Sequence, residues 1–263
     1  MSTSVTHSTD DGLEFIEEGR EDGPLVVLIH GSLDRALGML RVSRQIQKQA
    51  RVLRWDRRGY AQNATHAGPY TVPGNVDDLI RFLNGRSAVL VGHSFGGNIA
   101  LATAARLGDQ ISGVSTYETP LSWFDWWPTS TAGATSLSVP SEQAAEAFMT
   151  RLIGNRRWSE LPERTKEERR REGPALTTEL QSIRDSAPWT SEEIQCPVLC
   201  GYGSRGLDHH KKGAVWLGEH LPRAQSVLIE DAGHGAPNSH AEEFAKLLIQ
   251  PHLDSDGSFT SMS

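Results

Sequence analysis

The sequence predicts an α/β fold: a mostly parallel central sheet with helices on both faces and a helical cap insertion. Two observations predict it. Short apolar, β-branched runs alternate with segments whose apolar residues recur at helical spacing, a pattern typical of a parallel sheet with crossover helices. The interval 119–193 breaks this alternation, contains no strand candidate, and at about 70 residues is too long for a plain loop between strands.

The strands are predicted where apolar runs stop at turn residues. We expect an edge strand over Leu13–Glu17. The core strands follow in chain order: Val26–His30, Val52–Asp56, Ala88–His93, Ile111–Glu118, Pro197–Gly203 and Ser226–Asp231. Helical spacing of apolar residues predicts the core helices between them: Ala36–Gln49, Asn75–Leu83, Phe95–Leu107, His210–Leu221 and His240–Ile249.

This pattern divides the chain into a core and an insertion. We assign residues 13–118 and 194–253 to the core and residues 119–193 to the cap, with cap helices expected over Ser141–Ile153 and Glu163–Ser182. The ends, residues 1–12 and 254–263, are polar and rich in small residues, so we expect both to be disordered tails.

Composition excludes several classes of protein. The net charge is −7, which opposes binding to nucleic acid or to an anionic membrane surface. The longest internal apolar run, Leu25–Ile29, is far shorter than the roughly 20 residues of a bilayer span. Cys196 and Cys200 would lie roughly 13 Å apart on a strand, too far for a disulfide. We therefore expect a cytoplasmic protein whose partner is a small molecule.

Ser94 lies in the motif with the most specific chemistry. Gly92-His93-Ser94-Phe95-Gly96 fits the pattern G-x-S-x-G, follows an apolar strand and opens a helix. The two glycines lack the Cβ atoms that would clash in so sharp a turn, so the Ser94 hydroxyl can project at the carboxyl edge of the sheet. This setting indicates a nucleophilic serine.

From Leu25 to Ile249 the chain resembles the α/β-hydrolase family. The motifs that carry the resemblance are HGS (30–32), DRRGY (56–60), GHSFGG (92–97) and AGHG (232–235), in the order and spacing of that family. The resemblance implies that the backbone N–H groups of Ser32 and Phe95 form the oxyanion hole. Two preorganised donors of this kind stabilise the negative charge that develops on an attacked carbonyl oxygen.

A serine hydroxyl needs an adjacent base at neutral pH, and His234 is the candidate. It follows the last predicted strand, in EDAGHGAP, and the order of serine before histidine agrees with the same family. We interpret His30 and His93 as structural residues at the margin of the site. The adjacent His209 and His210 are interpreted as a solvated start of a helix, so no metal site is expected.

The acid that would orient His234 is left open between two residues. The common family pattern has an Asp in a G-x-x-D turn, but here Gly206 holds that position. Asp208 lies two residues later and could also be an ordinary helix N-cap. Glu118 ends the strand after the elbow helix, a site that some α/β hydrolases use for the acid, and burial of its carboxylate needs a partner. We favour Glu118.

Aromatic residues directly follow Glu118. We expect Trp123, Trp126 and Trp127 to form an apolar pocket wall, although the same residues could simply attach the cap to the sheet. The sequence thus predicts a serine hydrolase, without cofactor or metal, that cleaves an ester, thioester or lactone of a small, largely apolar substrate through an acyl-enzyme. The alternatives are a non-hydrolytic enzyme of this fold (lyase, cyclase or cofactor-free haloperoxidase) and a ligand-binding protein with a degenerate triad.

Overall fold

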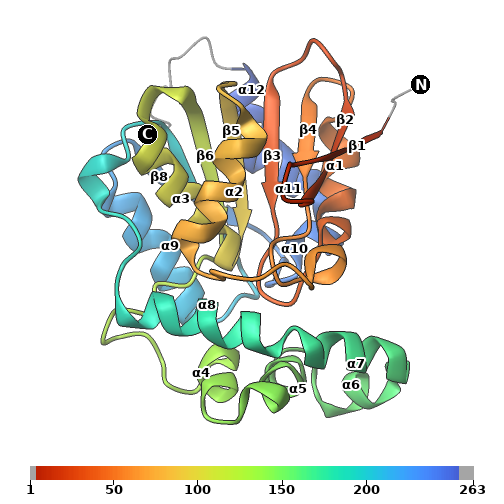
Figure 1. Ribbon diagram of the computed structural model, residues 1–263. Coiled ribbons are helices and arrows are strands. Elements are labelled where there is room, and N and C mark those ends of the chain that lie inside the picture. Colours follow the sequence, from red (N-terminus) through yellow and green to blue (C-terminus); the bar gives the residue numbers. More distant parts are fainter. Residues whose placement is uncertain (1–3, 255–263) are drawn as a thin grey trace.

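The computed structural model describes residues 4–254 and contains one eight-stranded sheet in the order β1-β2-β4-β3-β5-β6-β7-β8 (Figure 1). β1 pairs with β2 and β2 pairs with β4 in antiparallel fashion, and all other neighbours are parallel. The strands are β1 Val5–Ser8, β2 Glu14–Gly19, β3 Leu25–Ile29, β4 Arg51–Arg54, β5 Ala88–His93, β6 Ile111–Tyr117, β7 Val198–Gly203 and β8 Ala224–Ile229. The predicted fold class is confirmed.

Helices cover both faces of the sheet. The α-helices of the core are α1 Leu40–Ile46, α2 Val72–Leu83, α3 Phe95–Leu107, α9 Asp208–His220, α10 Ala236–Ser239, α11 Ala241–Leu248 and α12 Gln250–Asp254. Short 3₁₀ helices lie at Ala36–Met39, Ala61–Asn63, Gly108–Gln110 and Ser191–Glu193. No helix within residues 4–254 is both long enough and apolar enough to cross a membrane.

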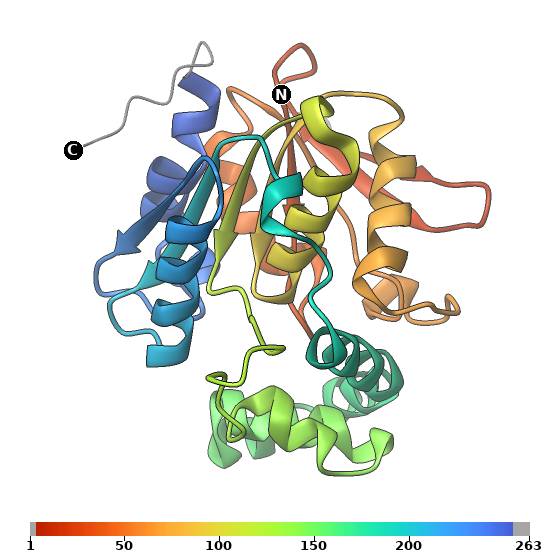
Figure 2. The ribbon, with the colours of Figure 1, turned by 90° about the vertical axis from the view of Figure 1, so that its left-hand side faces the viewer.

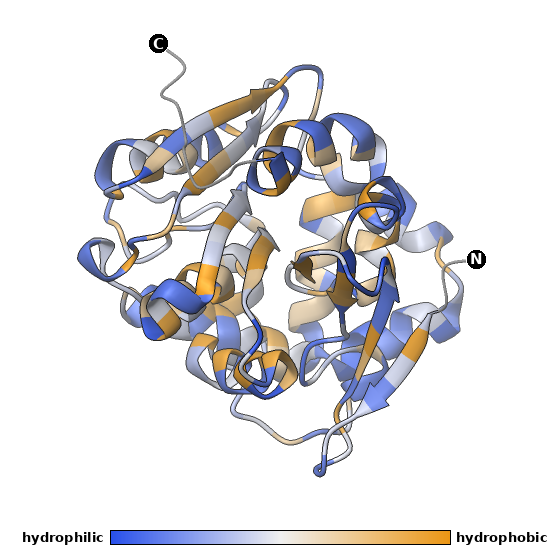
Figure 3. Ribbon diagram, turned by 90° about the horizontal axis from the view of Figure 1, so that it is seen from above, coloured by the Kyte–Doolittle hydropathy of each residue, from blue (hydrophilic) through white to orange (hydrophobic). Residues whose placement is uncertain are grey.

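Two hydrophobic clusters fill the space between helices and sheet. Residues of α2, α3 and α9 pack on one face, and residues of α1 and α11 pack on the other. The strand β3 is apolar throughout because both of its faces are covered. Val27 belongs to the first cluster and its neighbour Val26 to the second. Seen from above, the central strands carry the hydrophobic residues and the surrounding helices are largely hydrophilic on their outer sides (Figure 3).

The N-terminal segment differs from its prediction. Val5–Ser8 forms β1, paired with β2 from Val5 opposite Glu17 to Ser8 opposite Glu14, so a disordered tail over 1–12 is wrong for this part. A polar edge strand has no alternating apolar face, which leaves no period-2 signal in the sequence. Residues 1–3 lie outside the described residues, as does the C-terminal tail prediction beyond Asp254.

Five α-helices lie between β6 and β7 and stand beneath the carboxyl ends of the strands in both views (Figures 1 and 2). They are α4 Ala132–Leu137, α5 Ser141–Ile153, α6 Asn155–Glu160, α7 Glu163–Arg171 and α8 Gly173–Asp185. A single helix predicted over Glu163–Ser182 is in fact split into α7 and α8. Pro174, which has no N–H to donate, lies in the first turn of α8.

A buried ion pair joins this helical layer to the core. Arg57, in the loop after β4, donates to Glu179 of α8 over 2.8 Å, and both side chains are fully buried. The Tyr60 hydroxyl donates to the same carboxylate over 2.6 Å. Arg57 also donates to the carbonyl oxygens of His30 and Gly31, at 3.1 and 3.0 Å. One guanidinium therefore connects α8 to the turn after β3.

Candidate active site

Ser94 lies at the sharp turn between β5 and α3. Its φ and ψ are 52° and −124°, a conformation that costs a serine about 1–3 kcal/mol and persists because the surroundings enforce it. A Cβ on Gly92 would lie 2.3 Å from the Gly96 carbonyl oxygen, and one on Gly96 would lie 2.3 Å from the Ile29 oxygen. Both glycines of the motif are therefore needed for the turn that presents Ser94.

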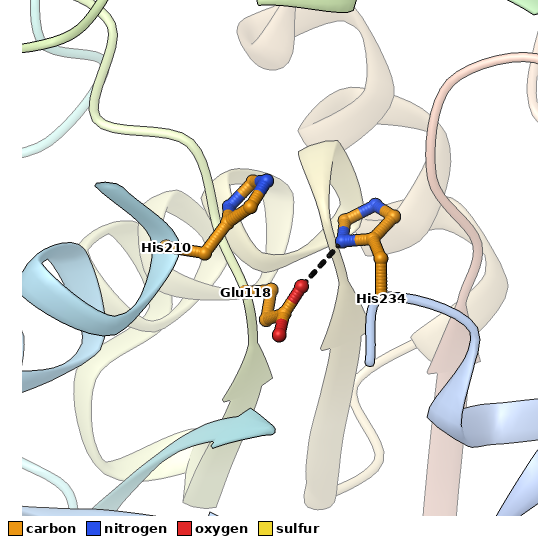
Figure 4. A group of neighbouring side chains, drawn as sticks. All are labelled: Glu118, His210 and His234. Carbon is orange, nitrogen blue, oxygen red and sulfur yellow. Dashed lines mark hydrogen bonds and ion pairs between the residues drawn. The ribbon is translucent and has the colours of Figure 1, made fainter. Parts of the chain in front are cut away.

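Glu118 and His234 form a hydrogen-bonded pair (Figure 4). The Glu118 side chain is fully buried, and its Oε2 lies 2.8 Å from Nδ1 of His234. Its other oxygen, Oε1, accepts a hydrogen bond from the Gly203 N–H at 3.2 Å. A carboxylate on Nδ1 holds the proton on that nitrogen and leaves Nε2 of His234 free to act as a base.

Gly206, the position where the family pattern places an Asp, explains the choice of acid. A Cβ built on Gly206 would lie 2.2 Å from Oε1 of Glu118, so the Glu118 carboxylate occupies the space that a side chain at 206 would need. Asp208, the alternative acid, is fully exposed and forms an ion pair with Lys211 at 3.9 Å. Within residues 4–254, Glu118 and not Asp208 is bonded to His234.

Two side chains form hydrogen bonds with the backbone of the loop that carries His234. The His93 ring nitrogen Nε2 is 2.8 Å from the His234 carbonyl oxygen, and the Tyr117 hydroxyl donates to the Gly233 carbonyl over 2.9 Å. Burial lowers the pKa of His93 to about 3, so this ring is neutral and donates its one N–H to that carbonyl. His93 is a structural residue, as interpreted from the sequence; the role of Tyr117 was not visible there.

Ser94, His234 and Ser32 line one cavity of about 630 Å³. No hydrogen bond joins the Ser94 and His234 side chains in the part of the chain described, and in unliganded sites such bonds are often long and shorten with substrate bound. The structure thus places the predicted nucleophile and the predicted base in the same cavity, without a direct hydrogen bond between them.

The two predicted oxyanion-hole residues flank Ser94. A Cβ on Gly31 would lie 2.9 Å from the Ser94 Cβ, so the turn that leads into Ser32 packs directly against the serine. Phe95 is the first residue of α3, where a backbone N–H has no partner inside the helix. His30 fixes the same turn: its Nε2 accepts from the Arg57 N–H at 2.9 Å, while its Nδ1 lies 2.7 Å from the Gly31 oxygen.

His210 is a site residue that the sequence prediction missed. Its ring stacks on His234 at 4.9 Å between centroids, with an angle of 25° between the planes. Burial, and then the positive charge that His234 can carry, hold the pKa of His210 well below its usual range. The interpretation as a solvated helix start is therefore wrong for His210, which lines the cavity. His209 is half-buried and also lines the cavity, 4.7 Å from the Trp127 ring, so the same interpretation is wrong for it.

Glu118, His210 and His234 are also close enough together to be candidate metal ligands. One ligand atom of each lies within 4.8 Å of the others. The lone pair of an imidazole nitrogen lies in the plane of the ring, however, and the two histidine rings are stacked (Figure 4). A single ion could not meet both lone pairs unless one ring turned, and the Glu118–His234 bond would be lost. The arrangement fits a proton-transfer pair better than a metal centre.

Only one of the three tryptophans expected in the pocket lines it. Trp127 does, whereas Trp123 and Trp126 are not among the lining residues in the part described. Trp123 packs edge-on against Trp189 at 5.5 Å, and the Lys212 ammonium lies 4.3 Å from the Trp126 ring. These two attach the segment after β6 to the core. Larger apolar residues of the wall come from α5, α8 and the loop before α9: Phe148, Leu152, Leu180, Ile183 and Leu207.

Comparisons with known proteins show the family and the fold. Residues 26–247 match the model of a family described as the alpha/beta hydrolase family. The chain is similar to the pimeloyl-[acyl-carrier protein] methyl ester esterase of Chromobacterium violaceum, 28% identical over 247 residues that cover 88% of this chain and 95% of that protein.

Two solved structures illustrate the shared fold. The 2-hydroxy-6-oxo-6-phenylhexa-2,4-dienoate hydrolase of Rhodococcus sp. strain RHA1 has a TM-score of 0.74 at 15% identity, covering 97% of this chain and all (100%) of that one. A thermophilic esterase from Thermogutta terrifontis has a TM-score of 0.70 at 20% identity, with coverage of 94% and 96%. At these identities the likeness concerns the fold.

Proposed function

The chain belongs to the alpha/beta hydrolase family, and within it we propose that the protein is a serine hydrolase that cleaves an ester, thioester or lactone of a small, largely apolar substrate. One observation carries the proposal: a cavity lined by Ser94 also contains His234, whose Nδ1 is bonded to the buried Glu118. The similarity to a methyl ester esterase supports esterase-type hydrolysis.

Each side chain has a defined role in this proposal. Nε2 of His234 takes the proton of the Ser94 hydroxyl as Oγ attacks the substrate carbonyl carbon, and the Glu118 carboxylate stabilises the imidazolium that forms. The N–H groups of Ser32 and Phe95 donate to the oxyanion, each contributing about 3 kcal/mol in sites of this kind. His234 then gives its proton to the leaving alkoxide or thiolate, and the acyl group remains on Ser94.

Water completes the reaction. His234 takes a proton from a water molecule, the resulting hydroxide attacks the acyl carbon, and Ser94 leaves as the alkoxide and regains its proton from His234. The lining favours apolar acyl or alcohol groups, since Trp127, Ile183 and Leu180 face the same cavity. Burial of such groups provides about 25 cal/mol for each Å² of apolar surface removed from water.

The test is the intact mass of the protein after exposure to a small fluorophosphonate, with Ser94→Ala as the matched control. We expect one adduct on the wild type and none on the variant, followed by turnover on a panel of esters, thioesters and lactones. A folded wild type that takes no adduct would contradict an activated serine. An adduct without turnover on any ester would favour the non-hydrolytic enzymes of this fold.

A further inference from the structure

We propose that the cavity holds a carboxylate-binding site at its cap side, formed by Arg184 and Arg151, and that the preferred substrate is an ester whose hydrocarbon chain ends in a carboxylate. This inference rests on the proposed function, because it names the class of ester that Ser94 would attack.

Two cap helices present the same kind of face to the cavity. The cap residues concerned come from α5 and α8: Phe148, Arg151, Leu152, Leu180, Ile183 and Arg184. Residues three and four apart share one side of a helix. On α5 the apolar residues at 148 and 152 therefore lie beside Arg151, and on α8 those at 180 and 183 lie beside Arg184. Each helix thus offers an apolar strip and one guanidinium.

These two guanidinium groups lack a carboxylate partner. Arg184 is partly buried and makes no side-chain hydrogen bond or ion pair with any residue among 4–254. Arg151 donates only to the carbonyl oxygen of Ser130, at 3.3 Å. In contrast, Arg169 and Arg170, also in the cap, are paired with glutamates at 3.1 and 3.0 Å. A partly desolvated cation without a partner, such as Arg184, is costly, and an anionic ligand would supply the missing acceptor. Arg151 is exposed and presents a second guanidinium to the same cavity.

The other charges around the cavity also favour binding of the substrate carboxylate at the two arginines. Asp208 is the one carboxylate among the described lining residues; it belongs to α9 of the core and is already paired with Lys211. The chain as a whole carries a net charge of −7 and repels an anion at long range. A negative group on the substrate is therefore attracted locally, at the arginines, and not by the general field of the protein.

Leu180 and Ile183 line the cavity together with Ser94 and lie beside Arg184 on the same face of α8, so apolar wall adjoins this arginine. A flexible aliphatic chain suits such a wall, and a planar guanidinium matches a carboxylate with two parallel hydrogen bonds. The proposed substrate has a group for each of these parts: an ester for Ser94, methylenes for the apolar wall and a carboxylate for the arginines.

The test compares mono-4-nitrophenyl adipate with 4-nitrophenyl hexanoate, which share chain length and leaving group and differ in the terminal carboxylate. We expect the wild type to prefer the adipate about tenfold in kcat/KM, as for a charge-assisted bond in a partly exposed site. Arg184→Gln and Arg151→Gln should bring this ratio close to one, chiefly through a higher KM for the adipate. Arg171→Gln, an exposed cap arginine outside the cavity, should leave it unchanged.

Binding to Ser94→Ala separates the two proposals. We expect calorimetric titration of this variant with monomethyl adipate to show binding that the added Arg184→Gln change weakens about tenfold. Hydrolysis of both nitrophenyl esters with equal kcat/KM would overturn the carboxylate site while the esterase function stands. Binding of monomethyl adipate that depends on Arg184, in a protein that hydrolyses no ester, would retain the site and refute the esterase.

Discussion

The ion pair between Arg57 and Glu179 predicts that replacing Glu179 destabilises the protein strongly. Both side chains are fully buried, and Glu179 also accepts the Tyr60 hydroxyl. Glu179→Leu leaves a buried guanidinium uncompensated, which costs about 3–5 kcal/mol. Since a domain is stable by only about 5–15 kcal/mol, this is a large share of the whole. Urea denaturation followed by tryptophan fluorescence and by circular dichroism measures the loss.

A matched pair of variants identifies the cause. Tyr60→Phe removes one hydrogen bond to Glu179 but leaves the ion pair, so we expect a loss of about 1 kcal/mol. Arg57→Met combined with Glu179→Leu replaces both charges by apolar groups of similar size, and such replacements are often neutral or stabilising. The double variant should therefore be clearly more stable than Glu179→Leu alone.

Activity should not recover with stability. Arg57 donates to the carbonyl oxygens of His30 and Gly31, in the turn that leads to Ser32. Without the guanidinium this turn loses two hydrogen bonds, and small displacements in a site of this kind can lower the rate about a hundredfold. We expect the double variant to be stable with a much reduced kcat. A Glu179→Leu protein within 1 kcal/mol of the wild type, or a double variant with full kcat, would refute this reasoning.

The remaining predictions concern the histidines and the acid. Glu118→Gln should lower kcat by several orders of magnitude, as loss of a triad acid does. Asp208→Asn should change kcat less than threefold. The opposite result in ester assays would reverse the assignment of the acid. His210→Ala should loosen the His234 ring and lower kcat about tenfold with little change in KM, and equal kcat values would show that the stack is incidental. Stability should fall as the pH drops below about 6.5, because burial lowers the pKa of His252 to about 4, so the unfolded chain takes up a proton that the folded one does not. The free energy of unfolding, measured by urea titration at pH 7 and at pH 5, should fall by up to about 1.4 kcal/mol per pH unit for such a histidine. An equal free energy of unfolding at both pH values would contradict the buried neutral ring.

The parts of the molecule that the sequence predicted correctly are those in which local chemistry determines local structure. The strand β3 is apolar along its whole length because both of its faces are covered. The helix Phe95–Leu107 was predicted with the bounds it has, since the glycine turn before it and Gly108 after it leave little choice. In the same way, the elbow motif places Ser94 without any knowledge of distant residues.

Contacts between distant residues were not predictable in this way. Arg57 and Glu179 are 122 positions apart, and nothing in DRRGY or in the sequence of α8 indicates that they meet. The prediction that all three tryptophans line the pocket was wrong for a related reason. Trp126 and Trp127 are adjacent in the chain, so their side chains leave the backbone in different directions, and only Trp127 reaches the cavity. Their position directly after Glu118 placed the aromatic residues near the site but could not orient them.

Gly206 shows that an absent side chain can be as informative as a present one. In the sequence it was only the place where an expected acid was missing, and Glu118 and Asp208 competed to replace it. In the structure, the missing Cβ makes room for the Glu118 carboxylate, whose oxygen would lie 2.2 Å from that atom. A side chain at 206 would displace the Glu118 carboxylate from its present place beside His234, so the two positions compete for the same space. A glycine in the G-x-x-D turn together with a Glu at the end of the strand after the elbow helix therefore forms one signal, because a Glu118 carboxylate in this place requires a residue without a side chain at 206.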